Sequence, residues 1–216
     1  MSDAEKLSVL QERIHPDRTV LLVVDMQNDF VSPEGKMAQF GFEIGSVRET
    51  IEPIRKVLEA ARSLGYPIIH TSMINDIQQN PPSWHAFWGD PVITLPGSWG
   101  AEYIEELRPR AGEPVLSKYT YGAFIGTNLD TMLRRLNVRT ILVTGTDLNI
   151  CAGDTMHQAF AVGYHVVAVS DCLACFSRIG REHAEQLKAM GLYLVENHFG
   201  IAVDSKTLIE ILKRGR

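Results

Sequence analysis

The chain of 216 residues is 45% hydrophobic and 22% charged, a composition typical of one globular domain rather than of a disordered or fibrous chain. Its 26 acidic and 21 basic residues give a net charge of −5, which argues against nucleic acid or an anionic membrane surface as a partner. No apolar run approaches the roughly 18 residues of a membrane-spanning helix, and the polar N-terminus lacks the apolar core of a signal peptide. Three cysteines are too few for a disulfide framework, so we expect a cytoplasmic protein.

Apolar runs rich in Val and Ile alternate with helix-like stretches along the chain. We expect residues 1–18 to form a short helix or arm, and residues 19–216 to form one domain. Runs that are apolar throughout predict parallel strands buried on both faces. Strands are expected at 19–24, 67–72, 114–117, 139–144, 164–170 and 192–195. Helical periodicity and cap residues predict helices at 46–64, 128–136, 151–162, 181–190 and 205–212. This alternation predicts a three-layer α/β/α sandwich around a parallel sheet.

The segment 73–111 does not fit the alternation. It holds all three tryptophans of the chain and four prolines between Pro81 and Pro96, and it is too long for a plain connector. Long loops in compact domains are usually functional. We therefore expect an ordered lid that covers a pocket, with a contact between subunits as the alternative.

Three chemically active side chains come just after predicted strands. Asp25 follows the first strand, Lys118 follows the third, and Cys151 follows the fourth and opens a helix. In an open parallel sheet, ligands bind beyond the carboxyl ends of the strands. A helix N-terminus and a nearby lysine lower the pKa of a thiol, and a carboxylate can accept its proton. Taken singly, however, a free cysteine is more often a buried packing residue than a nucleophile. Asp25 alone could equally be a helix cap or a loop carboxylate, and Lys118 alone a surface residue.

Three motifs change that assessment. The stretches VVDMQNDF, SKYTYGAF and VTGTDLNICAGDTMHQAFAVGYHVVAVSDC together resemble the isochorismatase-like cysteine hydrolase superfamily, over about residues 18–212. The resemblance implies a six-stranded parallel sheet of order 3-2-1-4-5-6 and a catalytic triad of Asp25, Lys118 and Cys151. It also implies a cis peptide between Thr146 and Asp147, and an oxyanion hole made by the backbone N–H groups of Asp147 and Cys151.

Positions at which this sequence differs from known members of the superfamily limit the reactions that we expect. Members that cleave isochorismate lack the nucleophilic cysteine, so Cys151 favours hydrolysis of a C–N bond. Nicotinamidases of this superfamily carry an Asp-x-His pattern after the second strand, together with a further His, and these residues bind a metal ion. In this chain Asp76 and His85 stand at the wrong spacing for such a site, so no metal is predicted. The remaining resemblance is to enzymes that act on ureido and carbamoyl compounds. Alternatives are a nicotinamidase-like amidase, an ester or vinyl-ether hydrolase, and a catalytically silent binding protein.

Aromatic residues near the predicted site are candidates for the pocket wall. These candidates are Phe30, Trp84, Trp88 and Tyr121, with core or interface packing as the alternative for each. The expected partner is a small amide or ureido substrate, no cofactor is expected, and the relatives suggest a homo-oligomer, either a dimer or a tetramer. The pair Cys172 and Cys175 is predicted to be neither a redox nor a metal motif, although the end of the fifth strand places it near the pocket.

Overall fold

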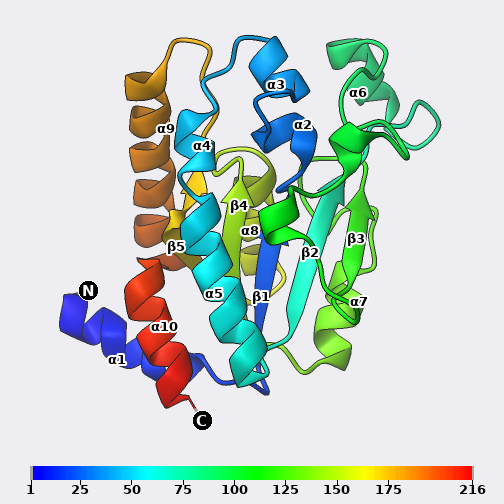
Figure 1. The fold of residues 1–216 in the computed structure, drawn as a ribbon. Coiled ribbons are helices and arrows are strands. Elements are labelled where there is room, and N and C mark those ends of the chain that lie inside the picture. Colours follow the sequence, from blue (N-terminus) through cyan, green and yellow to red (C-terminus); the bar gives the residue numbers. More distant parts are fainter. Residues whose placement is uncertain (1, 216) are drawn as a thin grey trace.

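A computed structural model, which describes residues 2–215, shows a twisted parallel sheet with helices on both faces (Figure 1). The sheet has six strands in the order β3-β2-β1-β4-β5-β6. This confirms both the predicted α/β/α sandwich and the strand order. The strands are β1 (Thr19–Val24), β2 (Ile68–Met73), β3 (Val115–Lys118), β4 (Thr140–Thr146), β5 (His165–Ala174) and β6 (Gly200–Val203).

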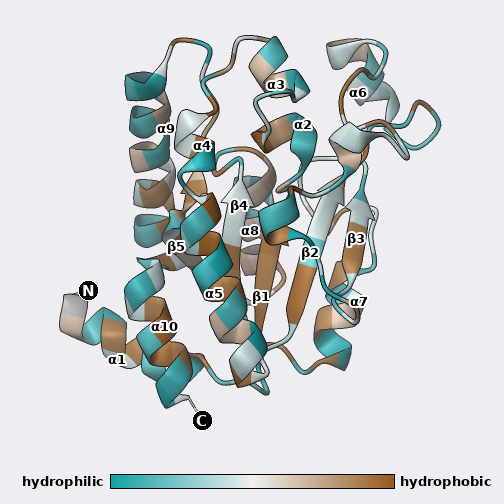
Figure 2. Ribbon diagram, viewed as in Figure 1, coloured by the Kyte–Doolittle hydropathy of each residue, from teal (hydrophilic) through white to brown (hydrophobic). Residues whose placement is uncertain are grey.

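The central strand β1 shows why the strand sequences are apolar throughout. Every residue of TVLLVV is buried. Leu21 and Val23 enter one hydrophobic core, whereas Val20, Leu22 and Val24 enter the other. Side chains alternate between the two faces of a strand, so a strand covered on both faces needs apolar residues at every position. Figure 2 shows the resulting hydrophobic interior of the sheet.

Helices cover both faces of this sheet. The main helices are α1 (Asp3–Arg13), α5 (Ile51–Leu64), α7 (Leu129–Arg135), α8 (Cys151–Ala161), α9 (Arg181–Leu194) and α10 (Ser205–Arg214). Buried residues of α1, α5 and α10 contribute to one core, and those of α7 and α8 contribute to the other. Within 2–215, no helix combines the length and the apolar character needed to cross a bilayer.

The helix predicted for 46–64 is two helices. The short α4 (Gly45–Arg48) ends before α5 begins at Ile51. The hydroxyl of Ser46 donates to the Glu43 carboxylate at 2.7 Å, and the hydroxyl of Thr50 donates to the Val47 carbonyl at 2.7 Å. Short polar side chains that bond to nearby groups in this way compete with regular helix. The predicted end is confirmed, because Gly65 caps α5 in the left-handed conformation, with φ of 76°.

The sixth strand was predicted in the wrong place. Residues 192–195 continue α9 into a π-helical turn (Val195–Phe199), and β6 begins only at Gly200. Val195 and Phe199, four residues apart, both pack into the core beside α8. A short apolar run of this kind fits the buried face of a helix as well as it fits a strand.

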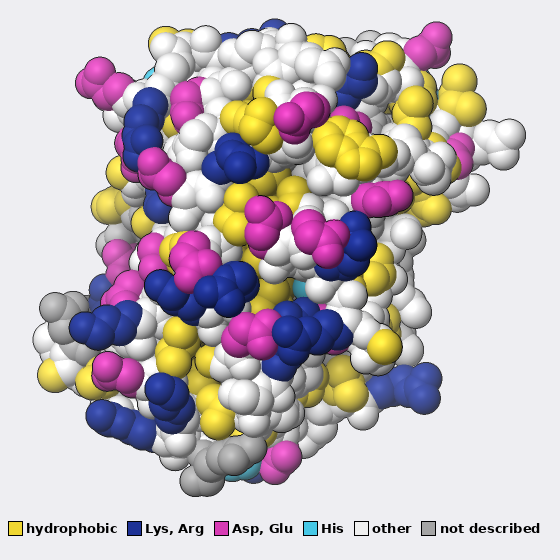
Figure 3. Space-filling view, in the orientation of Figure 1, with side chains coloured by type: hydrophobic (Ala, Val, Ile, Leu, Met, Phe, Trp, Pro, Cys, Tyr) yellow, Lys and Arg dark blue, Asp and Glu magenta, His cyan; other side chains and the backbone are white. Residues whose placement is uncertain are grey.

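The segment 73–111 is ordered around three short helices. These are α6 (Pro82–Trp88) and the 3-10 turns η1 (Trp99–Ala101) and η2 (Glu105–Leu107). In Figure 1, α6 lies above the carboxyl ends of β2 and β3. Figure 3 shows hydrophobic side chains gathered on this part of the surface, where Phe87 is 77% and Trp88 is 56% exposed. Two further short helices, α2 (Asn28–Val31) and α3 (Lys36–Gln39), lie beside the segment at the same end of the sheet.

Candidate active site

The fold brings the three candidate catalytic side chains together at the carboxyl end of the sheet. Asp25 follows the last residue of β1, Lys118 is the last residue of β3, and Cys151 is the first residue of α8. The strand β2 lies between β1 and β3, and Met73 pairs with Lys118 across the ladder. The parallel arrangement therefore places residues from three distant parts of the chain at one edge.

Asp25 and Lys118 form a buried ion pair. Lys118 Nζ lies 2.7 Å from Asp25 Oδ2, and neither residue exposes any surface. The ammonium also donates to the Thr120 carbonyl at 3.2 Å and approaches the Met73 sulfur at 3.6 Å. Burial alone would lower the pKa of Lys118, but the negative charge of Asp25, with a smaller effect of Cys151, outweighs burial and raises it. The lysine therefore stays charged.

The remaining carboxylate oxygen of Asp25 is held by a residue that the sequence did not single out. The Thr71 hydroxyl donates to Asp25 Oδ1 at 2.7 Å, and the Thr71 carbonyl accepts the Asp25 N–H at 3.2 Å. Asp25 itself has a left-handed backbone, with φ of 51°, which is uncommon for a residue other than glycine. The strand register pairs Val24 with Thr71, and this brings Thr71 within reach of Asp25, the next residue.

Cys151 lies beside both of these groups. The charges of Lys118 and Asp25 both act on its thiol, and only 8% of the residue is exposed. Burial raises the pKa of the Cys151 thiol, while the Lys118 charge acts in the opposite direction. The expected lowering by Lys118 is thus present but outweighed by desolvation. The resting group is a thiol, so its attack on a substrate requires a base, and Asp25 is the carboxylate at the same end of the sheet.

Two backbone N–H groups at this site are free to bind an oxyanion. The peptide bond between Thr146 and Asp147 is cis. Within 2–215, the N–H groups of Asp147 and Cys151 donate no hydrogen bond to another group of the protein. The Asp147 side chain accepts the N–H groups of Asn149 at 2.7 Å and of Phe176 at 2.8 Å, which holds this turn in place. Such preorganised donors can stabilise the oxygen of a tetrahedral intermediate.

Three of the four candidate pocket residues lie together. The Trp84 and Tyr121 ring centroids are 4.7 Å apart, and Trp88 Nε1 donates to the Tyr121 hydroxyl at 3.0 Å. Burial raises the pKa of Tyr121, and the nearby Cys151 adds to the effect. Tyr121 therefore joins the segment 73–111 to the chain that follows β3 and Lys118. Phe30 lies apart from this group, because its ring packs on Phe176 with the centroids 6.3 Å apart.

Other candidate ligands and thiols serve the structure. Asp76 Oδ1 accepts the N–H of Gln78 at 2.8 Å, as in a local turn. Residues 2–215 contain no cluster of three or more His, Cys, Asp or Glu side chains that could hold a metal ion. Cys172 is buried in one hydrophobic core and Cys175 in the other. Cys175 immediately precedes Phe176, whose N–H binds the Asp147 carboxylate.

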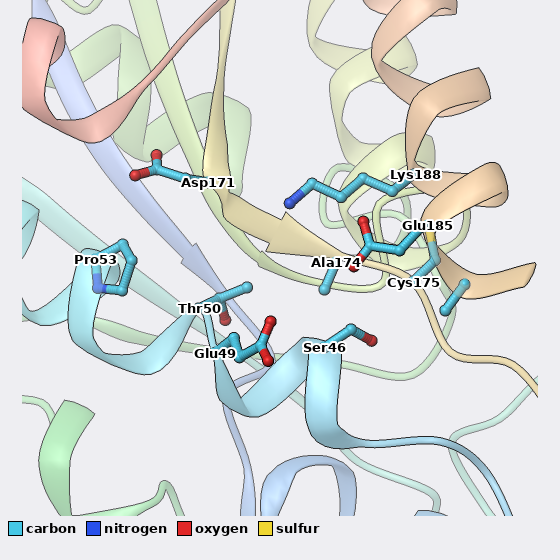
Figure 4. Close-up of a pocket in the computed structure, with 10 residues that line it drawn as sticks. Ser46, Glu49, Thr50, Pro53, Asp171, Ala174, Cys175, Glu185 and Lys188 are labelled. Atoms are coloured by element: carbon cyan, nitrogen blue, oxygen red, sulfur yellow. The ribbon is translucent and has the colours of Figure 1, made fainter. Parts of the chain in front are cut away.

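A cavity of about 240 Å³ lies elsewhere in the molecule. It is bounded by α4, α5, the end of β5 and α9, and Figure 4 shows the side chains that line it. Its lining includes Cys175 and Lys188 but none of Asp25, Lys118 and Cys151. Glu49 at its rim forms a two-bonded ion pair with Arg181, both bonds at 2.6 Å. The candidate active site is thus separate from this cavity.

Comparison with known proteins gives the same class. The family model of the isochorismatase domain matches residues 19–205. The chain is 30% identical to the ureidoacrylate amidohydrolase RutB of Serratia proteamaculans, over 88% of this chain and 80% of that protein. A cysteine hydrolase from Pseudomonas syringae pv. phaseolicola shares its fold with a TM-score of 0.86 and 28% identity, over 94% of this chain and 96% of that one. The N-carbamoylsarcosine amidase from Thermoplasma acidophilum shares the fold with a TM-score of 0.70 and 30% sequence identity. This match covers 87% of this chain and 96% of that one.

The fold and the matches together define a hydrolase of the isochorismatase-like cysteine hydrolase superfamily, as predicted. The chain belongs to the isochorismatase family, and its relatives include ureidoacrylate amidohydrolases.

Proposed function

We propose that this protein is an amidohydrolase that cleaves a C–N bond of a small ureido or carbamoyl compound, with Cys151 as the nucleophile. The observation that carries the proposal is the buried Asp25–Lys118 ion pair at the end of the sheet where α8 begins with Cys151, whose thiol is affected by both charges. A binding protein has no need of a thiol, a carboxylate and an ammonium gathered at one buried site. Perturbed titratable groups that cluster in this way are typical of catalytic sites.

The first half of the reaction forms a covalent intermediate. Asp25 accepts the thiol proton as Cys151 Sγ bonds to the substrate carbonyl carbon. The carbonyl oxygen becomes an oxyanion, held by the N–H groups of Asp147 and Cys151. The C–N bond then breaks, and Asp25 returns its proton to the leaving nitrogen. The products of this half are ammonia or an amine and an acyl or carbamoyl thioester on Cys151.

The second half uses the same groups. Asp25 removes a proton from a water molecule, and the resulting hydroxide attacks the thioester carbon. The C–S bond breaks, the acid product leaves, and the proton on Asp25 returns to the Cys151 sulfur. Throughout, Lys118 holds the Asp25 carboxylate at 2.7 Å and offsets the charge that develops on sulfur.

The named relatives and the wall of the site support the choice of substrate class. The relatives with a named substrate act on ureidoacrylate and on N-carbamoylsarcosine, both of which contain a urea-type C–N bond. The aromatic group of Trp84, Trp88 and Tyr121 supports this choice, because its rings cluster and could supply apolar walls for a small substrate. We further propose that the domain of residues 19–216 acts as a homo-oligomer in the cytoplasm. Its three free cysteines and the exposed Phe87 and Trp88 support this.

Ammonia release from a substrate panel tests the proposal. The panel contains ureidoacrylate, N-carbamoylsarcosine, biuret and nicotinamide, and it compares the wild type with Cys151→Ala. We expect release from at least one ureido compound by the wild type and a loss of at least 10³-fold in Cys151→Ala. The matched control is Cys172→Ala, because Cys172 is also buried but lies outside the cluster.

Two results would contradict the proposal. Turnover retained in Cys151→Ala would exclude the covalent mechanism. No release from any compound, together with a Cys151 that iodoacetamide does not modify, would instead indicate a binding protein that keeps the fold.

A further inference from the structure

The motif that contains Asp25 also contains three polar residues that take no part in the chemistry proposed above. Gln27, Asn28 and Asp29 are all buried, with at most 8% of each residue exposed. Buried polar side chains are normally hydrogen-bonded, so their partners show what they do. All three bond to the segment 73–111.

Gln27 and Asn28 bind the start of that segment and its η1 turn. The Gln27 amide donates to the carbonyls of Met73 at 2.9 Å and Ala101 at 3.0 Å, and it accepts the Met73 N–H at 2.8 Å. Asn28 donates from its side chain to the Trp99 carbonyl at 2.8 Å. The start of the segment and its η1 turn are therefore fixed to the loop that carries Asp25.

Asp29 reaches the middle of the segment. Its Oδ2 accepts the N–H of Thr94 at 2.6 Å, and its Oδ1 accepts the N–H of Lys36 at 3.2 Å. Thr94 is completely buried and has a φ of 48°, a left-handed conformation that is a genuine outlier for a β-branched residue. Such a conformation persists only where its surroundings impose it. The bond from Thr94 to Asp29 is one of the contacts that impose it.

Contacts continue from Thr94 to the aromatic wall of the site. Asn75 Nδ2 donates to Thr94 Oγ1 at 3.1 Å, and Asn75 Oδ1 accepts Trp84 Nε1–H at 2.9 Å. Trp84 in turn packs on Tyr121, with ring centroids 4.7 Å apart. A series of contacts thus runs from Asp29 through Thr94, Asn75 and Trp84 to Tyr121, which follows the strand that ends with Lys118.

We propose that Asp29 is a positioning residue that, through Thr94 and Asn75, sets Trp84 against Tyr121 and so determines how tightly the substrate binds. The inference rests on the proposed amidohydrolase function. Asp29 has no contact with Asp25, Lys118 or Cys151 among the interactions of residues 2–215, so its effect is on binding and not on proton transfer.

The test is Asp29→Asn, with Asp90→Asn as the matched control. Asp90 undergoes the same substitution in the same segment but is exposed. The substitution keeps the size of the side chain but replaces the Asp29 carboxylate, which accepts two backbone N–H groups, with a neutral amide. We expect the KM for ureidoacrylate to rise at least tenfold, with kcat changed less than threefold. We also expect Cys151 to react with iodoacetamide at the wild-type rate or faster, and backbone amides of 84–100 to exchange hydrogen faster.

A second variant covers the case in which Asp29→Asn does not fold. Trp84→Phe keeps an aromatic ring but removes the bond to Asn75, and we expect the same increase in KM without a loss of kcat. The inference is overturned if KM stays at the value of Asp90→Asn, or if kcat and the alkylation rate fall together. Unchanged hydrogen exchange in Asp29→Asn also overturns it. That measurement needs no substrate, so it is separate from a failure of the proposed function, which a wild type without ammonia release would show.

Discussion

Lys118 is the group in the cluster whose removal separates electrostatics from covalent chemistry. It lowers the pKa of the Cys151 thiol, although burial leaves that pKa raised overall. In Lys118→Met, the thiolate loses its cation and faces an unpaired Asp25 carboxylate. We expect the alkylation of Cys151 by iodoacetamide at pH 8 to slow by at least tenfold, about one pKa unit. The measurement is the alkylation rate as a function of pH.

Lys188→Met is the control for that experiment. Lys188 is a half-buried lysine that lines the separate cavity. An alkylation rate that is the same in Lys118→Met and Lys188→Met would mean that Lys118 does not stabilise the thiolate. Because an unpaired buried charge destabilises a protein by about 3–5 kcal/mol, circular dichroism should first confirm that the variant is folded.

The sequence predicted which three side chains meet at the candidate site better than it predicted their surroundings. Asp25, Lys118 and Cys151 could be found because parallel strands bring their carboxyl ends to one edge, whatever the loops do. Thr71 could not be found, because its contact with Asp25 depends on the strand register. The contact of Asp29 with Thr94 joins residues 65 positions apart through an irregular loop, and no periodicity predicts such a contact. The raised pKa of Cys151 also depends on burial, which only the folded structure reveals.

At the scale of elements, the same limit applies to short segments. The long buried strands and the helices with a clear apolar face were predicted close to their observed places. The strand predicted for 192–195 lies instead in α9 and the turn that follows it, because four apolar residues do not distinguish a strand from a buried helical face. The break between α4 and α5 depends on the hydroxyls of Ser46 and Thr50, whose partners are not visible in a hydrophobic pattern.

The close approach of β1 and β4 next to the site requires a glycine. Gly145 has a φ of 107°, and a Cβ atom there would lie 2.1 Å from the Val24 carbonyl oxygen. Gly145→Ala should therefore destabilise the protein by about 2–4 kcal/mol. The new residue would be strained at this φ, and the backbone of β1 would have to move away from its Cβ atom. Urea unfolding measures the change.

Gly163→Ala is the matched control for Gly145→Ala. Gly163 has a similar φ of 100°, but nothing lies within 4 Å of its added Cβ. It should cost only the backbone strain, about 1 kcal/mol. Equal losses of stability in the two variants would mean that β1 and β4 separate easily at this point.

A buried ion network joins α5 to β2 and to the loop before β3. Arg62 donates to both carboxylate oxygens of Glu113, at 2.7 and 2.9 Å, and His70 Nε2 lies 3.0 Å from Glu113 Oε2. Burial alone would raise the pKa of Glu113, but these partners lower it from 4.5 to about 2. A carboxyl group whose pKa is lower in the folded state stabilises the protein above its unfolded pKa, and this contribution disappears as the pH falls.

Glu113→Gln should therefore cost about 2 kcal/mol near pH 7, allowing for partial solvent screening. The difference from the wild type should shrink as the pH falls from about 4.5 towards 2. Urea unfolding at a series of pH values measures it. The control is Glu52→Gln, which removes an exposed pair with Arg55 and should leave stability almost unchanged. A difference independent of pH would contradict the assignment.

At the scale of the whole molecule, the two ends of the sheet differ in structure. The amino end is closed by short connections, whereas the carboxyl end carries the catalytic cluster and the segment 73–111 (Figure 1). Polar residues of the Asp25 loop fix that segment from within, but its outer surface remains apolar (Figure 3). Exposed apolar side chains in a rigid segment are costly in water and mark a contact surface.

A second copy of the chain is the partner that we expect on this surface. Phe87 and Trp88 stack edge to face with centroids 4.8 Å apart, and Ile77 and Val92 in the same segment are 61% and 55% exposed. Phe87→Ser should lower the association constant of the oligomer at least tenfold, since a buried phenylalanine contributes about 1.5–3 kcal/mol. Sedimentation velocity measures the fraction of oligomer from which this constant follows. Ile179→Ser is the control, because Ile179 is 80% exposed on the loop before α9. If Phe87→Ser leaves the association unchanged while Ile179→Ser weakens it, the subunit contact lies at the loop before α9, and the apolar surface of 73–111 stays open for substrate entry.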